Sequence, residues 1–206
     1  METAHGLGIR STATIMFGHV DGPVNWARHL LRLLDLQKRT GGFTEFVPLP
    51  FVHMEAPIFL KGLARLGPTF REAVLMHAVS RLVFHASIPN IQASWVKLGP
   101  VGLQYCLRAG VNDVGGTLMN ETITRSAGAI HGQEMPPETL ESLIRDAGRV
   151  PRQRTTLYDT PPQERRAAAI DRPALKACVN TIARGYENDP KIKRNLLRQG
   201  RVSELS

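Results

Sequence analysis

Cysteine is scarce in this sequence of 206 residues, which holds Cys106 and Cys178 and no CxxC pair. The cysteines of this chain alone therefore form neither a zinc site nor an iron–sulfur site. Long apolar runs are also missing, and none approaches the ~20 residues that a membrane-spanning helix requires. The first residues lack the basic and then apolar pattern of a secretory signal. We therefore expect a cytoplasmic protein that does not enter a membrane.

Several enzyme motifs are missing as well. The sequence has no GxSxG and no HExxH segment, which argues against an α/β-hydrolase and a zinc peptidase. Gly6-Leu7-Gly8 lacks the third glycine of a dinucleotide-binding fingerprint. It also precedes a strand pattern, which is the reverse of the order that the fingerprint requires.

The excess of positive charge is concentrated near the end of the sequence. Residues 145–206 hold 14 of the 26 Lys and Arg residues but 7 of the 18 Asp and Glu residues, so they carry nearly all of the formal charge of +8. Their aromatic residues are Tyr158 and Tyr186, too few for a surface that stacks bases. We therefore expect a solvated basic tail over residues 161–206, partly helical or disordered, and no nucleic-acid site.

Strand and helix patterns alternate regularly before this tail. The expected strands cover residues 10–17, 43–47, 91–96 and 113–118, and the expected helices cover residues 23–40, 69–86, 99–110 and 136–147. Strand, helix and strand within about 30 residues, with glycine at the joints, is typical of a right-handed βαβ unit in a parallel sheet. Residues 1–160 therefore predict an α/β fold of four βα units. Four units are half of a (βα)8 TIM-type barrel, with an open sheet edge on each side.

Some local details accompany this prediction. Pro48 and Pro50 lack the N–H group that a central strand donates, so the second strand should end near Val47. Asp21 or Gly22 can cap the first long helix. A capping box of Thr69 and Glu72 should start the next one. We expect one face of that helix to be buried, and it consists of Val74, Leu75, Ala78, Leu82 and Val83.

Six side chains follow the third and fourth expected strands at their carboxyl ends: Ser94, Trp95, Lys97, Thr117, Asn120 and Glu121. In parallel α/β folds this edge of the sheet carries the chemistry. Each residue also has a structural interpretation. Trp95 could belong to the core because its strand is apolar, Lys97 could be solvated, and Glu121 could cap the helix that follows.

The segments NIQASWVKLG (residues 90–99) and GVNDVGGTLMNETITRSAGA (residues 110–129) carry a family resemblance. They resemble the C-terminal half of a radical S-adenosylmethionine enzyme, the tyrosine-dependent component of FO synthase that uses 5-amino-6-(D-ribitylamino)uracil. The segments GGTLMNE and HGQEMPPE favour this family over two similar enzymes of the menaquinone pathway, aminofutalosine synthase and dehypoxanthine futalosine cyclase. The resemblance extends from about Ala4 to Thr160.

The resemblance implies that the four units are the second half of the barrel. Family members hold a 4Fe-4S cluster with a CxxxCxxC loop after the first strand. S-adenosyl-L-methionine then supplies a radical, and the 4-hydroxybenzyl group of L-tyrosine is joined to the ribitylaminouracil. This sequence has no CxxxCxxC segment, so the resemblance implies a chain that is inactive alone. The missing amino-terminal half is a candidate partner chain.

The resemblance also implies which residues line the far wall of the barrel pocket. They are Met16, Gly18, His19, Pro48, Pro50, Phe51, His53, Ser94, Trp95, Lys97, Gly116, Thr117, Asn120 and Glu121. Gly115 and Gly116 would let a ligand approach the backbone closely. His19 and His53 could instead be hydrogen-bonded loop histidines.

Two other functions stay open. The chain could be a fragment of one of the menaquinone-pathway enzymes, which the dependence on tyrosine and ribitylaminouracil would distinguish. It could also be a non-catalytic remnant that binds a partner chain through its open sheet edges, or nucleic acid through its basic tail, which a steep salt dependence of binding would support.

Overall fold

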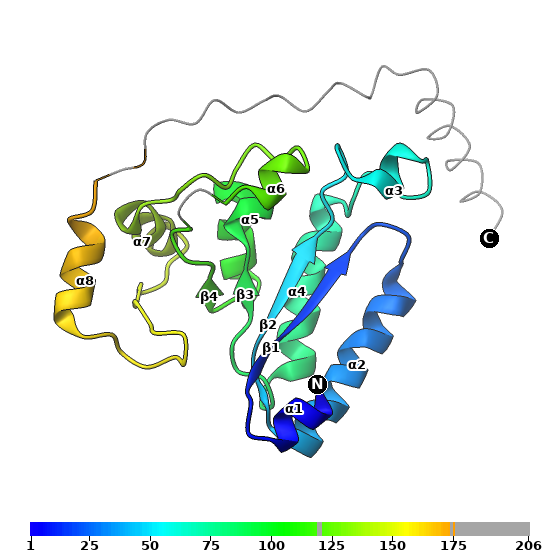
Figure 1. The fold of residues 1–206 in the computed structure, drawn as a ribbon, viewed down its shortest axis with the longest axis horizontal. Helices are drawn as coiled ribbons and strands as arrows, with labels where there is room; N and C mark the ends of the chain where they lie inside the picture. Colours follow the sequence, from blue (N-terminus) through cyan, green and yellow to red (C-terminus); the bar gives the residue numbers. More distant parts are fainter. Residues whose placement is uncertain (119–120, 174, 176–206) are drawn as a thin grey trace.

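The computed structural model describes residues 1–118, 121–173 and 175 as a mixed α/β fold (Figure 1). Its strands are β1 Ser11–Phe17, β2 Phe43–Pro50, β3 Gln92–Ala93 and β4 Asp113–Val114. Within the described residues the helices are α1 Glu2–Gly6, α2 Pro23–Thr40, α3 Pro57–Leu60, α4 Phe70–Phe84, α5 Trp95–Arg108, α6 Ile123–Ser126, α7 Pro137–Asp146 and α8 Gln163–Ile170. The four helices expected from the sequence correspond to α2, α4, α5 and α7.

All strand pairings are parallel, and the strands follow one another in chain order. β1 pairs with β2 along its whole length, and β3 pairs with β4. An isolated parallel bridge between Phe46 and Ile91 joins these two small sheets. The expected parallel α/β arrangement is therefore confirmed, and it is compatible with part of a barrel.

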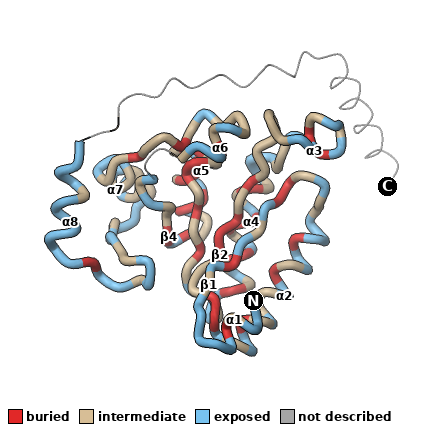
Figure 2. Tube along the Cα trace, in the orientation of Figure 1, coloured by how far each residue is buried: buried red, intermediate tan, exposed pale blue. Residues whose placement is uncertain are grey.

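The core lies between the strands and the helices behind them. Phe17, Phe46, Phe84, Ile91 and Leu103 have no exposed surface, and the buried residues gather along the strands and the inner faces of α4 and α5 (Figure 2). Side chains alternate between the two faces of a strand. One face of β1 thus packs on the helices, while alternate residues of the strand are exposed.

The helix boundaries follow the expected signals. Gly41 ends α2 with a left-handed φ of 63°, a conformation that glycine adopts without steric cost. The side chain of Thr69 accepts a hydrogen bond from the backbone N–H of Glu72, and the Glu72 carboxylate accepts one from the backbone N–H of Thr69. The predicted capping box of α4 is therefore confirmed.

The second strand continues through both of its prolines. Phe51 donates its backbone N–H toward β1 at 2.9 Å, whereas Phe46 donates toward the loop before β3 at 2.9 Å. Because backbone N–H groups alternate in direction along a strand, Pro48 and Pro50 share the direction of Phe46, away from β1. The N–H groups that these prolines lack are therefore not needed for the pairing of β1 with β2. The predicted end of the second strand at Val47 was wrong, since β2 extends to Pro50.

The buried face of α4 also differs from the prediction. It consists of Ala73, Met76, His77, Ser80 and Phe84, while Leu75 and Leu82 are 48% and 76% exposed. The polar members of the buried face bond within the helix. The Ser80 hydroxyl group donates to the carbonyl of Met76 at 2.6 Å, and Nδ1 of His77 donates to the carbonyl of Ala73 at 2.8 Å. Their polarity therefore did not prevent burial.

The third and fourth strands are shorter than predicted. β3 ends at Ala93, and Trp95 already begins α5, so Trp95 and Lys97 lie on a helix rather than at the end of a strand. A left-handed φ of 67° at Gly99 kinks α5 before Pro100, which explains why the sequence there resembled a helix start. β4 ends at Val114 instead of Leu118.

The end of the chain is described only in part. α8 lies within the predicted basic tail and contacts α7. Residues 176–206 and the expectation of disorder there lie outside the described residues. The boundary at residue 160 stays a prediction. In the described part of the chain, no helix is both long enough and apolar enough to cross a membrane.

Candidate functional site

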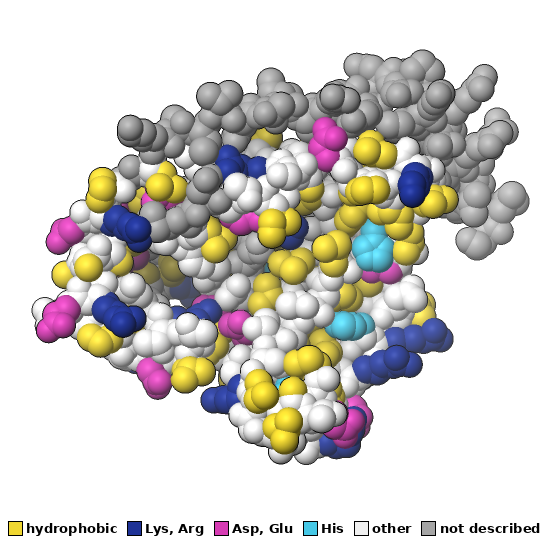
Figure 3. Space-filling model, viewed as in Figure 1, with side chains coloured by type: hydrophobic (Ala, Val, Ile, Leu, Met, Phe, Trp, Pro, Cys, Tyr) yellow, Lys and Arg dark blue, Asp and Glu magenta, His cyan; other side chains and the backbone are white. Residues whose placement is uncertain are grey.

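The candidate site lies at the carboxyl edge of the strands, where the loops after β1, β2 and β4 and the start of α5 lie (Figure 1). Hydrophobic side chains gather over α3 and the ends of β1 and β2 on the face shown in Figure 3. The backbone N–H of Glu55, in the loop after β2, donates to the carbonyl of Ala127 at 3.1 Å. The structure therefore brings the loops after β2 and β4 into contact.

One carboxylate organises the loop after β1. Oδ1 of Asp21 accepts the backbone N–H groups of Gly18 and His19 at 2.8 and 3.0 Å, and its Oδ2 accepts the indole N–H of Trp26 at 2.5 Å. Gly18 has a left-handed φ of 89°, and a Cβ atom there would lie 2.3 Å from Cδ of Pro68. Both the carboxylate and the glycine therefore fix the path of this loop.

The His19 ring is held by its neighbours on one side. Its Nδ1 accepts the backbone N–H of Val20 at 2.7 Å, and its ring centroid lies 5.7 Å from that of Phe51 in an edge-to-face arrangement. The carbonyl of His19 accepts the backbone N–H of Arg65 at 3.1 Å. The His19 side chain is 28% exposed, so the ring is positioned and still accessible. Met16, on β1, is also half-exposed.

The loop after β2 is packed against α3. The His53 ring lies 4.7 Å from that of Phe59, between centroids, and Phe59 is buried. Phe51 continues the pairing of β2 with β1 through its backbone N–H. Pro50 and the half-buried Phe51 thus lie beside the end of β1, where His19 follows.

At the start of α5, the three predicted residues have different surroundings. Ser94 is the N-cap residue. Trp95 is 2% exposed and belongs to the core, and its indole N–H donates to the carbonyl of Gly116 at 2.9 Å. Lys97 is half-buried. Burial lowers the pKa of its ammonium group, and the negative charge of Glu121 opposes this shift.

The loop after β4 carries the remaining predicted residues. Both carboxylate oxygens of Glu121 accept the backbone N–H of Thr124, at 3.0 and 3.1 Å, so Glu121 caps the start of α6 as the structural interpretation held. The carbonyl of Thr117 accepts the backbone N–H of Met135 at 3.1 Å. Gly116 is exposed and has open space at its Cβ position. Asn120 lies outside the described residues.

Sequence reasoning missed two residues beside this edge. It treated Asp21 only as a helix cap, although a carboxylate three residues after Gly18 was a signal for a loop closed by backbone N–H groups. Arg65 received no role. Its Nη1 donates to both carboxylate oxygens of Glu72 at 3.1 and 3.0 Å, and its Cζ lies 5.7 Å from the centroid of the Trp26 ring.

A second polar group of residues, the amino-end network, lies at the opposite end of the strands. It consists of Glu45, Gln92, Asp113, Arg154 and Tyr158. Nε and Nη2 of Arg154 donate to the two oxygens of Asp113 at 2.7 and 2.6 Å, and Gln92 donates to the same carboxylate at 2.7 Å. The Tyr158 hydroxyl group donates to Glu45 and lies 3.0 Å from Asp113. The network ties the segment after α7 to β2 and β4.

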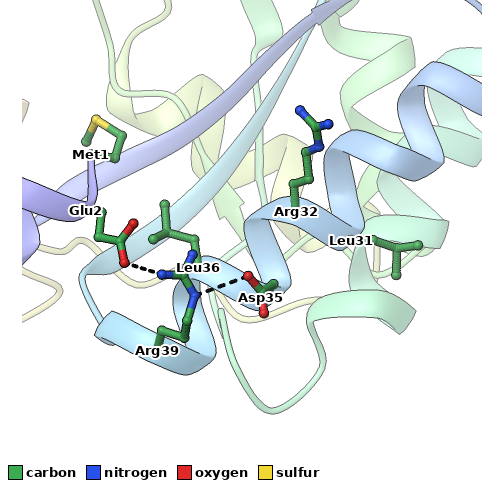
Figure 4. A pocket seen from close by; sticks show the side chains of 7 residues that line it. All are labelled: Met1, Glu2, Leu31, Arg32, Asp35, Leu36 and Arg39. Atoms are coloured by element: carbon green, nitrogen blue, oxygen red, sulfur yellow. Dashed lines mark hydrogen bonds and ion pairs between the residues drawn. The ribbon is translucent and has the colours of Figure 1, made fainter.

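A shallow hollow lies between α1 and α2, lined by Met1, Glu2, Leu31, Arg32, Asp35, Leu36 and Arg39 (Figure 4). The Arg39 guanidinium bridges the carboxylates of Glu2 and Asp35 across it. It includes the last turns of α2, next to the start of β2, and so belongs to the amino end of the strands. None of the predicted site residues lines it.

The residues of this chain do not fit a 4Fe-4S cluster. The sequence has two cysteines and no CxxxCxxC segment, and burial raises the pKa of the Cys106 thiol to about 12. Within the described ranges, no three His, Cys, Asp or Glu side chains are grouped closely enough to hold a metal ion. A 4Fe-4S cluster would therefore need ligands that these 206 residues do not supply.

The model of the protein family described as CofH/MqnC C-terminal region matches residues 40–167. FO synthase of Streptomyces coelicolor is 54% identical over 171 residues, which are 83% of this chain and 20% of that protein. The 5-amino-6-(D-ribitylamino)uracil–L-tyrosine 4-hydroxyphenyl transferase of Methanopyrus kandleri is 56% identical over 159 residues, or 77% of this chain and 43% of that protein. The chain thus spans less than half the length of these curated relatives.

Proposed function

This chain belongs to the CofH/MqnC C-terminal family, and we propose that it is the C-terminal part of a radical S-adenosylmethionine transferase of FO biosynthesis. The complete enzyme joins the 4-hydroxybenzyl group of L-tyrosine to 5-amino-6-(D-ribitylamino)uracil. The observation that carries this proposal is the identity of 53–56% to relatives named FO synthase or the corresponding transferase, over three quarters of the chain or more.

The structure supports the proposal through the arrangement of its strands. Parallel strands in chain order, each followed by a helix, place the ends of β1, β2 and β4 and the start of α5 at one edge. Enzymes with parallel α/β folds bind their substrates at this edge. The cytoplasmic location remains a prediction.

The proposed task of this chain is to bind and orient the reactants. The residues assigned to it are Met16, Gly18, His19, His53, Ser94, Lys97, Gly116, Thr117, Asn120 and Glu121. Trp95 supports them from the core by holding the carbonyl of Gly116. When bound, S-adenosyl-L-methionine and a reduced 4Fe-4S cluster would supply the radical. Because this chain does not fit the cluster, it needs an amino-terminal half, in the same or a separate chain, and is inactive alone.

The half-buried charges at the start of α5 and after β4 suit an amino-acid substrate. Lys97 presents a cation and Glu121 an anion, and the charge of Glu121 acts on Lys97. The indole bond from Trp95 to Gly116 holds the two segments together at 2.9 Å. A cation and an anion on adjacent segments complement the carboxylate and ammonium groups of tyrosine.

A segment exchange tests the proposed function. Residues 1–160 of this chain would replace the matching segment of the Methanopyrus kandleri transferase, and the purified hybrid would be reconstituted with iron and sulfide without oxygen. We expect consumption of tyrosine and ribitylaminouracil that depends on S-adenosyl-L-methionine. The same transferase without the segment is the control.

Two results would reject the proposal. A hybrid that folds and holds its cluster but does not convert these substrates would favour a non-catalytic remnant. A hybrid that instead converts a menaquinone-pathway substrate would assign the chain to that branch of the family.

A further inference from the structure

The ring nitrogens of His19 have unequal surroundings. Nδ1 accepts the backbone N–H of Val20 at 2.7 Å, and a nitrogen that accepts a hydrogen bond carries no proton. Oδ1 of Asp21 lies 3.7 Å from the same nitrogen, which is too far for a hydrogen bond. Nε2 makes no hydrogen bond to the described residues, and the side chain is 28% exposed. A neutral His19 must therefore carry its proton on Nε2, the nitrogen that remains available to a ligand.

The bond from Val20 to Nδ1 depends on the path of the loop, and Asp21 sets that path. Its carboxylate accepts three N–H groups, from the backbone of Gly18 and His19 and from the indole of Trp26, at 2.5–3.0 Å. Its side chain is 13% exposed. Hydrogen bonds to a carboxylate are about twice as strong as those between neutral groups. The three bonds that Asp21 accepts therefore hold the backbone of the loop that carries His19.

The ring is held from two further directions. Its edge-to-face contact with Phe51 links it to the end of β2. The hydrogen bond from the backbone of Arg65 to the carbonyl of His19 links it to the loop before α4. Arg65 is itself held by the carboxylate of Glu72. These contacts come from three segments of the chain. None of them is a hydrogen bond to Nε2.

We propose that Asp21 is a positioning residue that holds His19 with Nδ1 as a hydrogen-bond acceptor and Nε2–H as a donor, and that this donor binds an acceptor atom of a flat heterocyclic ligand at the carboxyl edge. Such a ring nitrogen or carbonyl oxygen occurs both in the adenine of the cosubstrate and in the uracil ring of the substrate. The Phe51 ring beside His19 suits a flat ring. The choice of ligand rests on the proposed function, whereas the state of His19 does not.

The state of His19 can be measured in the full chain by long-range ¹H–¹⁵N NMR with labelled histidine, and the signal is assigned by its loss in H19N. We expect Nδ1 to show the shift of an unprotonated ring nitrogen and Nε2 that of a protonated one. In D21N, one carboxylate oxygen is replaced by an amide, so we expect a mixture of the two tautomers. D35N removes an exposed carboxylate from α2 and should leave the His19 signals unchanged.

A Nδ1–H tautomer in the unchanged chain would overturn the proposal, and this result needs no variant to fold. Signals of His19 that stay the same in folded D21N would remove the positioning role of Asp21. Both results are independent of whether the segment exchange yields an active enzyme, so they separate this inference from the proposed function.

The role of the donor is tested by isosteres in the hybrid transferase. The amide nitrogen of Gln reaches the place of Nε2, whereas the shorter side chain of Asn does not. The loss of one neutral hydrogen bond weakens binding by roughly threefold to tenfold. We expect H19N to raise the KM of one ligand by this factor and H19Q to restore it. A change for S-adenosyl-L-methionine alone identifies the adenine, and a change for ribitylaminouracil alone identifies the uracil. Equal effects of H19N and H19Q would reject a donor role.

Discussion

Replacing Arg154 by Met should destabilise the fold although it lies far from the candidate site. The substitution keeps the aliphatic part of the side chain and removes the guanidinium that lies against Asp113 in the amino-end network. Asp113 is 9% exposed, so its carboxylate cannot recover full hydration after the change. The side chain of Arg154 is 26% exposed, which marks the ion pair as partly buried.

The magnitude follows from the bonds that are lost. Two charge-assisted hydrogen bonds join Arg154 to Asp113, at 2.6 and 2.7 Å, and each contributes about 1.5–3 kcal/mol. Removing one partner of a buried ion pair costs about 3–5 kcal/mol. Gln92 still donates to Asp113 in the variant, and the Tyr158 hydroxyl group still lies 3.0 Å from it. We therefore expect R154M to lower the free energy of unfolding by roughly 2–4 kcal/mol.

Urea unfolding followed by tryptophan fluorescence measures this loss, because Trp26 and Trp95 both lie in the core. R152M is the matched control. Arg152 is two positions away and exposed, and among the described residues it donates only to the hydroxyl group of Thr160, so its replacement should cost less than about 0.5 kcal/mol. A double-mutant cycle with D113N should give a coupling energy of about 1.5 kcal/mol or more.

The reasoning would be refuted if R154M and R152M had the same effect. A coupling energy near zero in the cycle would be equally damaging. It would show that the two residues do not interact in solution, and the segment after α7 would then be held by other contacts.

Three further predictions concern buried or strained positions. Burial lowers the pKa of His77 from 6.5 to about 4, so the unfolded chain binds the proton more readily. Stability should fall by roughly 3 kcal/mol as the pH drops from 6.5 to 4, and H77M should lose this part of the pH dependence of urea unfolding. The Cys106 thiol is buried with its pKa raised to about 12, so iodoacetamide at pH 8 should modify it only after unfolding, as mass spectrometry of the peptide would show. G18A should destabilise the chain by about 1–3 kcal/mol, because Gly18 has a left-handed backbone and its added Cβ atom would collide with Pro68. G6A should not destabilise the chain, because a Cβ atom there meets nothing within 4 Å. Equal melting temperatures of the two variants would contradict this prediction.

The order of the four strands and of α2, α4, α5 and α7 was predictable because local signals mark them. Gly41 and the Thr69–Glu72 capping box mark helix ends through backbone conformation and hydrogen bonds between near neighbours. Glycine at the joints and alternating strand and helix patterns then define the parallel α/β class. These signals involve residues close in sequence, so no knowledge of tertiary contacts was needed.

The details that failed depend on distant neighbours. Whether Pro48 and Pro50 interrupt the second strand depends on which adjacent strand their missing N–H groups would face, and the sequence does not contain that information. In α4, two adjacent faces are both apolar enough to be buried, and the helix presents Ala73 and Ser80 rather than Leu75 and Leu82 to the core.

The candidate site stays a prediction, and its internal hydrogen bonds were not predictable. The rule that polar residues after parallel strands gather at one edge is what nominated His19, Lys97 and Glu121. It could not show that the buried Trp95 donates a hydrogen bond to the carbonyl of Gly116, or that Asp21 accepts backbone N–H groups from the loop that carries His19. Both facts rest on hydrogen bonds whose geometry is set by the packed structure.

The two ends of the strands differ in how completely their polar groups are bonded. At the amino end, Asp113 accepts hydrogen bonds from Arg154 and Gln92 and contacts Tyr158. At the carboxyl edge, Nε2 of His19 has no hydrogen-bond partner in the described part of the chain. A polar group that is partly desolvated needs water or a ligand. Stability and ligand binding should therefore separate by mutation: R154M should lower the urea midpoint and leave the His19 tautomer unchanged, whereas H19N should weaken ligand binding with little effect on the midpoint. The opposite pattern would place the functional end of the molecule at the amino ends of the strands.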